Sequence, residues 1–245
     1  MIYVISDIHG CYAEYRELLE KIKFSSKDTL YILGDVVDRG PEPIKVIQDM
    51  MKRPNVNFIL GNHDYLMLMV MSKLVQEITE ENIDSGVLNE DLLMDYYAWM
   101  NDGGEVTVAQ FNSLERWEMI DILEYVQDAL IYEDIQVNKK RFILTHAGIK
   151  DYSYEKDLDE YHFTDFIFGR MDYSKRHFDD PDTYLVSGHT PTVLIREDRQ
   201  FLVYKGNGHI AIDCGCVSGG RLAAYCLDDG SITYVEANRD TFLEK

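Results

Sequence analysis

Basic residues are scarce in this 245-residue chain. Lysine and arginine together number 24 against 44 aspartate and glutamate residues, so the formal net charge at pH 7 is −20. Duplex nucleic acid and anionic membranes both require a basic protein surface, and neither is therefore expected as a partner. No apolar run approaches the roughly 20 residues of a membrane span. The N-terminal "MIYVISDIHG" lacks the basic and long apolar regions of a signal peptide, so we expect a cytoplasmic protein.

Cysteine is also sparse. The four cysteines, Cys11, Cys214, Cys216 and Cys226, include no C-x-x-C pair, which argues against a zinc ribbon or a thioredoxin-like redox site. We expect reduced thiols that pack as small apolar side chains. The chain shows no internal repeat, low-complexity segment or linker, so we expect residues 1–245 to form a single domain.

The apolar pattern of the first 60 residues alternates between strand and helix. Short apolar runs stand at 2–6 ("IYVIS"), 29–33 ("TLYIL") and 56–60 ("VNFIL"), as in strands that are buried on both faces. Between them, apolar residues at helical spacing predict helices over 12–22 and 41–53. This β-α-β-α-β order predicts a mainly parallel, layered sheet.

The pattern becomes helical and acidic from about 65 to 130. We interpret these residues as a helical insertion or cap, with a methionine-rich core stripe and a solvated charged stretch at 81–95. A strand at 141–145 ("RFILT") follows, and then an acidic, aromatic loop with a short helix. Further strands, expected to be antiparallel, stand at 184–188, 201–206, 209–215, 221–227 and 231–237. We interpret "GCVSGG" (215–220) as a tight turn between two of them, with an approach to the functional site as the alternative.

Polar side chains suited to metal binding or acid–base chemistry follow five of these strands. Ligands bind outside the carboxyl ends of the strands in open α/β sheets, so we expect these side chains to converge. They are Asp7 and His9; Asp35, Asp38 and Arg39; Asn62 and His63; His146; and His189. The other histidines, His162, His177 and His209, lack this context, and we expect them at the surface or in packing.

Oxygen and nitrogen ligands without a thiolate suit two divalent ions such as manganese, iron or zinc. A two-metal site holds its ions about 3.5–4 Å apart and needs a bridging ligand. Asp35, on the middle strand end, is placed to bridge, and Asp7 and His9 can share one ion because alternate residues point the same way. Asn62, His146 and His189 would complete the second ion's site. Water held between the ions becomes a hydroxide nucleophile near neutral pH.

Five motifs of the chain resemble, in the same order, those of the metallophosphoesterases of the phosphoprotein phosphatase (calcineurin-like) family. They are "SDIHG" (6–10), "GDVVDRG" (34–40), "GNHD" (61–64), "THAGI" (145–149) and "SGHTP" (187–191). That family includes Ser/Thr protein phosphatases and bacterial symmetrical diadenosine tetraphosphatases. The resemblance implies an α/β fold, a layered β-sandwich flanked by helices, here with a helical insertion.

The resemblance also implies a role for each residue. Asp7, His9 and Asp35 would hold the first of two divalent ions, with manganese the expected metal. The second ion would be held by Asp35, Asn62, His146 and His189, with Asp35 bridging. His63 matches the family's general acid, Asp38 the carboxylate that orients it, and Arg39 a clamp on phosphate oxygens. Arg170, in "FIFGRM", stands where bacterial relatives often carry a second phosphate-binding arginine.

The expected activity is hydrolysis of phosphate monoesters by metal-hydroxide attack, on a phosphorylated protein or a nucleotide. "GDVVDRG" keeps a second aspartate as Ser/Thr protein phosphatases do, and this type is the leading interpretation. "THAGI" and "DCGCVSGGRL" resemble dinucleotide hydrolases more closely, so diadenosine tetraphosphate hydrolysis is the alternative. A non-catalytic metal or nucleotide sensor would usually lack a ligand or the acid, and a nuclease would carry basic runs. The chain fits neither, and it carries no signal for an oligomeric state.

Overall fold

The structure is a computed structural model that describes residues 1–75 and 90–238. Its first sheet has the strand order β10-β9-β1-β2-β3. Strands β1 (Ile2–Ile5), β2 (Thr29–Leu33) and β3 (Val56–Ile59) are parallel to one another. Strands β9 (Arg221–Cys226) and β10 (Ile232–Glu236) extend this sheet in antiparallel pairing. The parallel β-α-β-α-β unit predicted for the first 60 residues is therefore confirmed.

The second sheet has the order β4-β5-β6-β8-β7. Its parallel centre consists of β5 (Lys140–Thr145), β6 (Thr183–Ser187) and β8 (His209–Ala211). Strands β4 (Tyr132–Val137) and β7 (Tyr204–Gly206) form antiparallel edges. Tight turns make both edge hairpins: Asn207 and Gly208, which join β7 to β8, have φ of 50° and 77°, as a two-residue hairpin turn requires.

The two sheets pack face to face. Along β2, Leu30 and Ile32 point to the helix-covered side, whereas Tyr31 and Leu33 point to the second sheet. The core between the sheets joins these residues to side chains of the other sheet, such as Phe142, Leu144, Val186 and Ile210. Alternate strand residues thus serve two apolar layers, which explains why the strand sequences are continuously apolar. The molecule has two mixed sheets flanked by helices, as the family resemblance implied.

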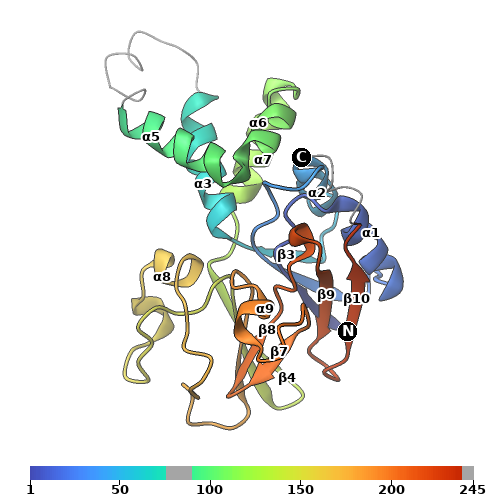
Figure 1. Ribbon diagram of the computed structural model, residues 1–245, viewed down its shortest axis with the longest axis vertical. Coiled ribbons are helices and arrows are strands. Elements are labelled where there is room, and N and C mark those ends of the chain that lie inside the picture. The colour runs from blue at the N-terminus through green and yellow to red at the C-terminus, as the bar shows by residue number, and fades with distance from the viewer. Residues whose placement is uncertain (76–89, 239–245) are drawn as a thin grey trace.

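Helices cover the outer side of the first sheet and rise above its edge (Figure 1). Helix α1 (Tyr12–Lys21) packs on β9, β10 and α2 (Pro43–Met50). Between β3 and β4 come α3 (Asn62–Leu74), α5 (Glu90–Trp99), the kinked turn η1 (Met100–Gly104), α6 (Glu105–Phe111) and α7 (Arg116–Gln127). Helix α3 packs on α5 and α7, and α6 packs on α2. Within the described ranges, no helix has the length and apolarity needed to cross a membrane.

Short helices complete the second half: η2 (Leu158–Glu160), α8 (Phe163–Ile167), α9 (Thr192–Ile195) and η3 (Cys216–Ser218). Two expectations for this half were wrong or incomplete. Strands β6 and β8 were expected to be antiparallel, but β6 is parallel to β5 and β8 is parallel to β6. After β6 the chain crosses over through α9 and then reverses in the β7–β8 hairpin. Strand β4 was not anticipated, since its sequence "YEDIQV" is largely polar at a sheet edge. Of the charged stretch predicted at 81–95, residues 81–89 lie outside the described residues.

Candidate metal centre and active site

The carboxyl ends of β1, β2, β3, β5 and β6 meet at one edge of the molecule and carry the predicted site residues. Six of these residues have positive φ: Asp7 (49°), His9 (42°), Asp35 (52°), Asp38 (70°), Arg39 (66°) and His189 (62°). This left-handed conformation is unfavourable for residues other than glycine, and such strain concentrates at functional sites. The backbone is therefore bent to aim these side chains at a common point.

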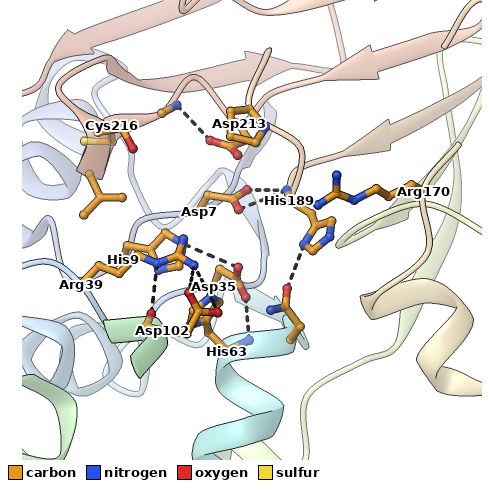
Figure 2. A pocket seen from close by; sticks show the side chains of 15 residues that line it. Asp7, His9, Asp35, Arg39, His63, Asp102, Arg170, His189, Asp213 and Cys216 are labelled. Atoms are coloured by element: carbon orange, nitrogen blue, oxygen red, sulfur yellow. Dashed lines mark hydrogen bonds and ion pairs between the residues drawn. The ribbon is translucent and has the colours of Figure 1, made fainter. Parts of the chain in front are cut away.

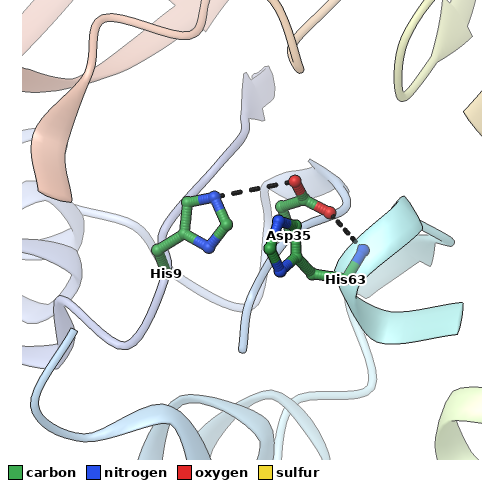
Figure 3. A group of neighbouring side chains, drawn as sticks. All are labelled: His9, Asp35 and His63. Atoms are coloured by element: carbon green, nitrogen blue, oxygen red, sulfur yellow. Dashed lines mark hydrogen bonds and ion pairs between the residues drawn. The ribbon is translucent and has the colours of Figure 1, made fainter. Parts of the chain in front are cut away.

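Asp35 lies between two histidines that come from different sheets. Its Oδ2 atom is 3.6 Å from His9 Nε2, and its Oδ1 atom is 3.5 Å from His146 Nε2. The opposite ring nitrogens, Nδ1, face the carbonyl oxygens of Val37 at 2.8 Å and Leu33 at 2.7 Å. A ring that donates Nδ1–H to a carbonyl directs the Nε2 lone pair into the site. Figure 3 shows His9 and His63 beside the Asp35 carboxylate. One carboxylate thus faces two sets of donors, as a bridging ligand must.

Asn62 gathers the remaining nitrogen donors. Its Oδ1 atom is 2.9 Å from both His146 Nε2 and His189 Nδ1. The carboxylate of Asp7 accepts the backbone N–H of His189 at 3.0–3.1 Å through both oxygens (Figure 2). Two groups of donor atoms, His9–Asp35–His63 and Asp35–His146–His189, each lie within 4.8 Å. This donor set fits two divalent ions that share Asp35.

The charges of the site also fit a cation. Burial, reinforced by the neighbouring carboxylates, raises the pKa of Asp7 and of Asp35 well above the usual value. Burial and neighbouring positive groups lower the pKa of His9 and His146 well below the usual value, and that of His189 to about 4. Imidazoles near pH 7 are therefore neutral, as metal ligands must be. A divalent ion would offset the repulsion between the buried carboxylates.

His63 and Asp38 form a buried pair beside the donor set. His63 Nδ1 is 2.7 Å from Asp38 Oδ2, and both side chains are almost fully buried. Asp38 also accepts hydrogen bonds from Trp99 Nε1 at 2.8 Å and from Thr107 Oγ1 at 2.6 Å. Both donors belong to the helical insertion, so α5 and α6 hold the carboxylate that holds the histidine. Motif analysis missed Trp99 and Thr107, because neither follows a strand.

The two arginines lie at the mouth of the site. Arg39 places its guanidinium 2.7 Å from His63 Nε2 and 3.1 Å from His9 Nε2. Arg170 is exposed and lines the same cavity, on the side of His189 (Figure 2). The three other histidines lie elsewhere, as expected: His162 caps α8, and His177 and His209 contact backbone carbonyls.

The cavity itself measures about 290 Å³. It is lined by Asp7, His9, Asp35, Asn62, His63, His189, Arg39 and Arg170 and also by residues that sequence reasoning had not placed there: Asp102, Asp213 and the turn Gly215–Ser218. The segment "GCVSGG" is therefore both a turn before β9, as the favoured interpretation had it, and a wall of the site, as the alternative had it. Asp38 and His146 do not line the cavity itself. Asp38 contacts His63, which does, and His146 Nε2 faces Asp35 and Asn62, which also do.

Asp64, at the start of α3, is the last residue of the motif "GNHD", and the motif alone did not explain its role. It accepts the backbone N–H groups of Asp35 at 2.7 Å, Val36 at 3.0 Å and Gly61 at 3.0 Å. These bonds tie the loop after β2 to the N-terminus of α3. Asp64 therefore fixes Asp35 and Asn62 relative to each other without touching the cavity.

Asp213 adds an unpredicted buried carboxylate near Asp7 (Figure 2). Burial raises the pKa of Asp213 from 3.8 to about 6. The free energy of unfolding is therefore higher below the unfolded-state pKa of Asp213 than above its folded-state pKa. It falls as the pH rises to about 6, because the folded chain then buries the charge. We expect Asp213→Asn to be more stable than the natural chain by up to about 3 kcal/mol above pH 6 in the metal-free protein. The advantage should shrink toward pH 4.

Urea unfolding in the presence of a chelator, at pH values on both sides of 6, checks this prediction. The asparagine Oδ1 can still accept the N–H of Gly215, which Asp213 Oδ1 accepts at 2.9 Å, so the substitution removes the charge and little else. A stability difference that does not change with pH would show that Asp213 does not titrate as its burial implies.

Comparison with known proteins gives the relationships of the chain. The family model described as calcineurin-like phosphoesterase matches residues 1–193. The asymmetrical bis(5'-nucleosyl)-tetraphosphatase PrpE of Halalkalibacterium halodurans is 28% identical to this chain, over 99% of this chain and 96% of its own length. The symmetrical bis(5'-nucleosyl)-tetraphosphatase of Chromobacterium violaceum is also 28% identical, over 93% of this chain and 92% of its own length.

A crystal structure described as that of a candidate diadenosine tetraphosphatase superposes with a TM-score of 0.66 at 22% identity, over 97% of this chain and 93% of that one. At this identity the likeness shows the fold alone. The family model, however, spans most of the chain and extends past His189, the last of the candidate metal ligands. The chain therefore belongs to the calcineurin-like phosphoesterase family and is a metal-dependent phosphoric ester hydrolase.

Proposed function

We propose that this enzyme is a phosphomonoesterase that removes phosphate from serine or threonine side chains of proteins. The observation that carries this proposal is the buried His63–Asp38 pair, with Nδ1 and Oδ2 2.7 Å apart. An alkyl phosphate leaves as a basic alkoxide and needs a proton from a positioned acid. A nucleotide leaves from an anhydride as a stable phosphate anion and needs such an acid far less. Asp38 orients His63, and Trp99 and Thr107 in turn hold Asp38 by hydrogen bonds. A histidine oriented in this way suits the leaving group that needs a proton more.

The two donor groups that share Asp35, together with the family resemblance, support the proposed metal assignment. Asp7, His9 and Asp35 would hold one ion, and Asp35, Asn62, His146 and His189 the other, and manganese is the proposed metal, with iron or zinc as alternatives that suit the same ligands. When bound, the ions supply a hydroxide near neutral pH and neutralise charge on the phosphate. Asp64 and the backbone carbonyls of Val37 and Leu33 keep the ligands oriented.

The chain's own groups would perform the remaining steps. The planar fork of Arg39 suits bidentate binding of phosphate oxygens, and Arg170 would bind a further oxygen from the opposite side of the cavity. The His63 ring would donate a proton from Nε2 to the departing oxygen, while Asp38 accepts Nδ1–H and stabilises the charged ring. These roles match those that the family resemblance implied for the same positions.

Net charge favours one kind of substrate. The chain carries a formal charge of −20, so its long-range field repels polyanions and attracts cations. A phosphorylated residue between basic neighbours would be drawn to this surface, whereas a dinucleoside tetraphosphate would be repelled until it reached the local positive charge of the site. We therefore propose a phosphopeptide with basic flanks as the preferred substrate class.

A second candidate function is hydrolysis of dinucleoside tetraphosphates. It is favoured by the relatives that align along the whole chain, both of which bear that name. The same metal ligands and arginines could bind an anhydride. A third candidate, a non-catalytic metal or nucleotide sensor, is disfavoured because none of the candidate ligands is missing and the candidate acid and Arg39 lie beside them.

A substrate panel with manganese present distinguishes these functions. It contains a phosphoserine peptide with basic flanks, the same peptide with acidic flanks, a phosphotyrosine peptide, diadenosine tetraphosphate and p-nitrophenyl phosphate. We expect the highest kcat/KM on the basic phosphoserine peptide, with an advantage over the acidic one that falls as salt is added. Highest kcat/KM on diadenosine tetraphosphate would establish the second candidate in its place. No turnover of any substrate would support the sensor.

Arg39 offers a separate test of the phosphate clamp. Removing one donor that stabilises developing charge typically costs about 10²–10³ in turnover. We expect Arg39→Ala to lose about this much on every substrate and to keep its full metal content, measured by elemental analysis. Loss of metal in this variant would indicate a structural role for Arg39.

The cysteines bear on location. All four cysteines lie in the described part of the chain, and all are free and buried. Unpaired thiols are typical of proteins in reducing compartments, which supports our proposal of a cytoplasmic enzyme.

A further inference from the structure

The kinked turn η1 of the insertion packs directly on Arg39. The Arg39 backbone N–H donates to the carbonyl of Gly103 at 3.0 Å. The guanidinium donates from Nε to the carbonyl of Asp102 at 3.3 Å and from Nη2 to Asp102 Oδ1 at 2.8 Å. Both the backbone and the side chain of Arg39 are thus held by two consecutive residues of the insertion.

The Asp102 carboxylate lies where an anion bound by Arg39 would lie. Nη2 of Arg39 is shared between Asp102 Oδ1 at 2.8 Å and His63 Nε2 at 2.7 Å. The second oxygen, Asp102 Oδ2, is 3.5 Å from His63 Nε2. Asp102 also lines the cavity, as Figure 2 shows beside Arg39 and His63. A carboxylate therefore already occupies the space between the clamp and the acid.

The backbone of η1 is built for this position. Gly103 has φ of 103°, which other residues rarely adopt, and a Cβ atom there would lie 2.6 Å from Arg39 Cγ. Gly104 packs against the ring of Trp99, where a Cβ atom would lie 2.7 Å from Cε2. The two glycines let the turn approach Arg39 closely. Asp102 is held in place by the fold, although its side chain is 54% exposed.

We propose that Asp102 is a latch on Arg39: its carboxylate occupies the arginine fork in the free enzyme and is displaced by the phosphoryl group of the substrate. The proposal rests on the phosphate-clamp role of Arg39 put forward under the proposed function. An ion pair as exposed as this one is weak, so a phosphate dianion bound also by metal can displace the carboxylate. After hydrolysis the carboxylate competes with the product phosphate for Arg39 and favours its release.

The latch predicts a change in product affinity, which a merely structural residue would not produce in this direction. We expect Asp102→Asn to bind inorganic phosphate about two- to fivefold more tightly, measured as the competitive inhibition constant with p-nitrophenyl phosphate as substrate. KM should fall together with the inhibition constant. The value of kcat should fall if phosphate release limits turnover, and otherwise it should stay the same. The matched control is Glu105→Gln, which removes one charge from an exposed residue of the same insertion and should leave the inhibition constant unchanged.

A double variant separates the latch from a general effect of charge. In the Arg39→Ala background, Asp102→Asn should no longer tighten phosphate binding, because the residue that the latch blocks is absent. Tightening that persists in this background, or weaker phosphate binding in Asp102→Asn alone, would overturn the latch. Measurements of metal content and thermal unfolding would identify a misfolded variant. If Asp102→Asn is misfolded, Asp102→Ser, which also removes the charge, is used in its place. If instead Arg39→Ala by itself leaves phosphate binding and turnover intact, the clamp of the proposed function has failed.

Discussion

Asp35→Asn is expected to abolish turnover and to deplete both metal ions. The two Asp35 oxygens face His9 Nε2 at 3.6 Å and His146 Nε2 at 3.5 Å, so this one residue is proposed to serve both ions. An asparagine offers one oxygen and no charge, and the other buried ligands would lose the carboxylate that joins them. Metal catalysis contributes several kcal/mol to stabilising the transition state, so we expect a loss of about 10³-fold or more in kcat.

The comparison variant is Asp7→Asn, whose carboxylate is expected to reach only the first ion. It should retain more metal and more activity than Asp35→Asn when both are measured by elemental analysis and by assay at saturating manganese. Chelation of the natural enzyme should abolish turnover, and manganese should restore it. If Asp7→Asn is clearly worse in both measurements, Asp35 is not the bridging residue. Full activity in a rigorously metal-free sample would disprove the metal mechanism as a whole.

His63→Asn is expected to lose activity in proportion to the basicity of the leaving group. A serine alkoxide needs a proton, and the loss on a phosphoserine peptide should be about 10²–10⁴-fold. The p-nitrophenolate ion is stable without one, so the loss on p-nitrophenyl phosphate should be much smaller. Both metals should remain, because the Nδ1 atom of His63 is engaged by Asp38 at 2.7 Å and the proposed metal ligands are other residues.

Asp38→Asn provides the companion test, because Asp38 acts only through His63. It should show the same dependence on the leaving group, with a smaller loss. Trp99→Phe removes one of the donors to Asp38, at 2.8 Å, and should produce the mildest form of this pattern. Equal losses on both substrates, with chemistry shown to limit the rate, would contradict the general-acid role. His63, which lies in a donor group with His9 and Asp35, would then be better explained as a ligand.

The order of the motifs in the sequence was sufficient to predict that the candidate ligands lie close together. Asp7, Asp35, Asn62, His146 and His189 each follow a short apolar strand, and parallel strands of a sheet end on the same side. The physical reason is that strand direction and strand ends can be recognised from local sequence. Pairing between distant strands is harder to predict: β8 was expected to be antiparallel to its neighbour and is parallel to β6.

The helical insertion shows where sequence reasoning stops. Its helices could be recognised from their periodicity, but their contacts could not be predicted. These contacts join residues that are 61 to 69 positions apart, and they depend on how the insertion folds back on the sheet. Trp99, Asp102 and Thr107 look like ordinary residues of an acidic helical segment. In the structure they hold Asp38 and Arg39 by hydrogen bonds.

The family, the parallel strand unit and the candidate ligands could thus be predicted from the sequence alone, since each depends on residues that are close together in the chain. Only the tertiary structure decided that a carboxylate of the insertion lies on Arg39, that Asp213 is buried near Asp7 and that the turn Gly215–Ser218 lines the cavity. These features arise where segments far apart in the chain are packed against one another, and the burial that raises the pKa of Asp213 exists only after that packing.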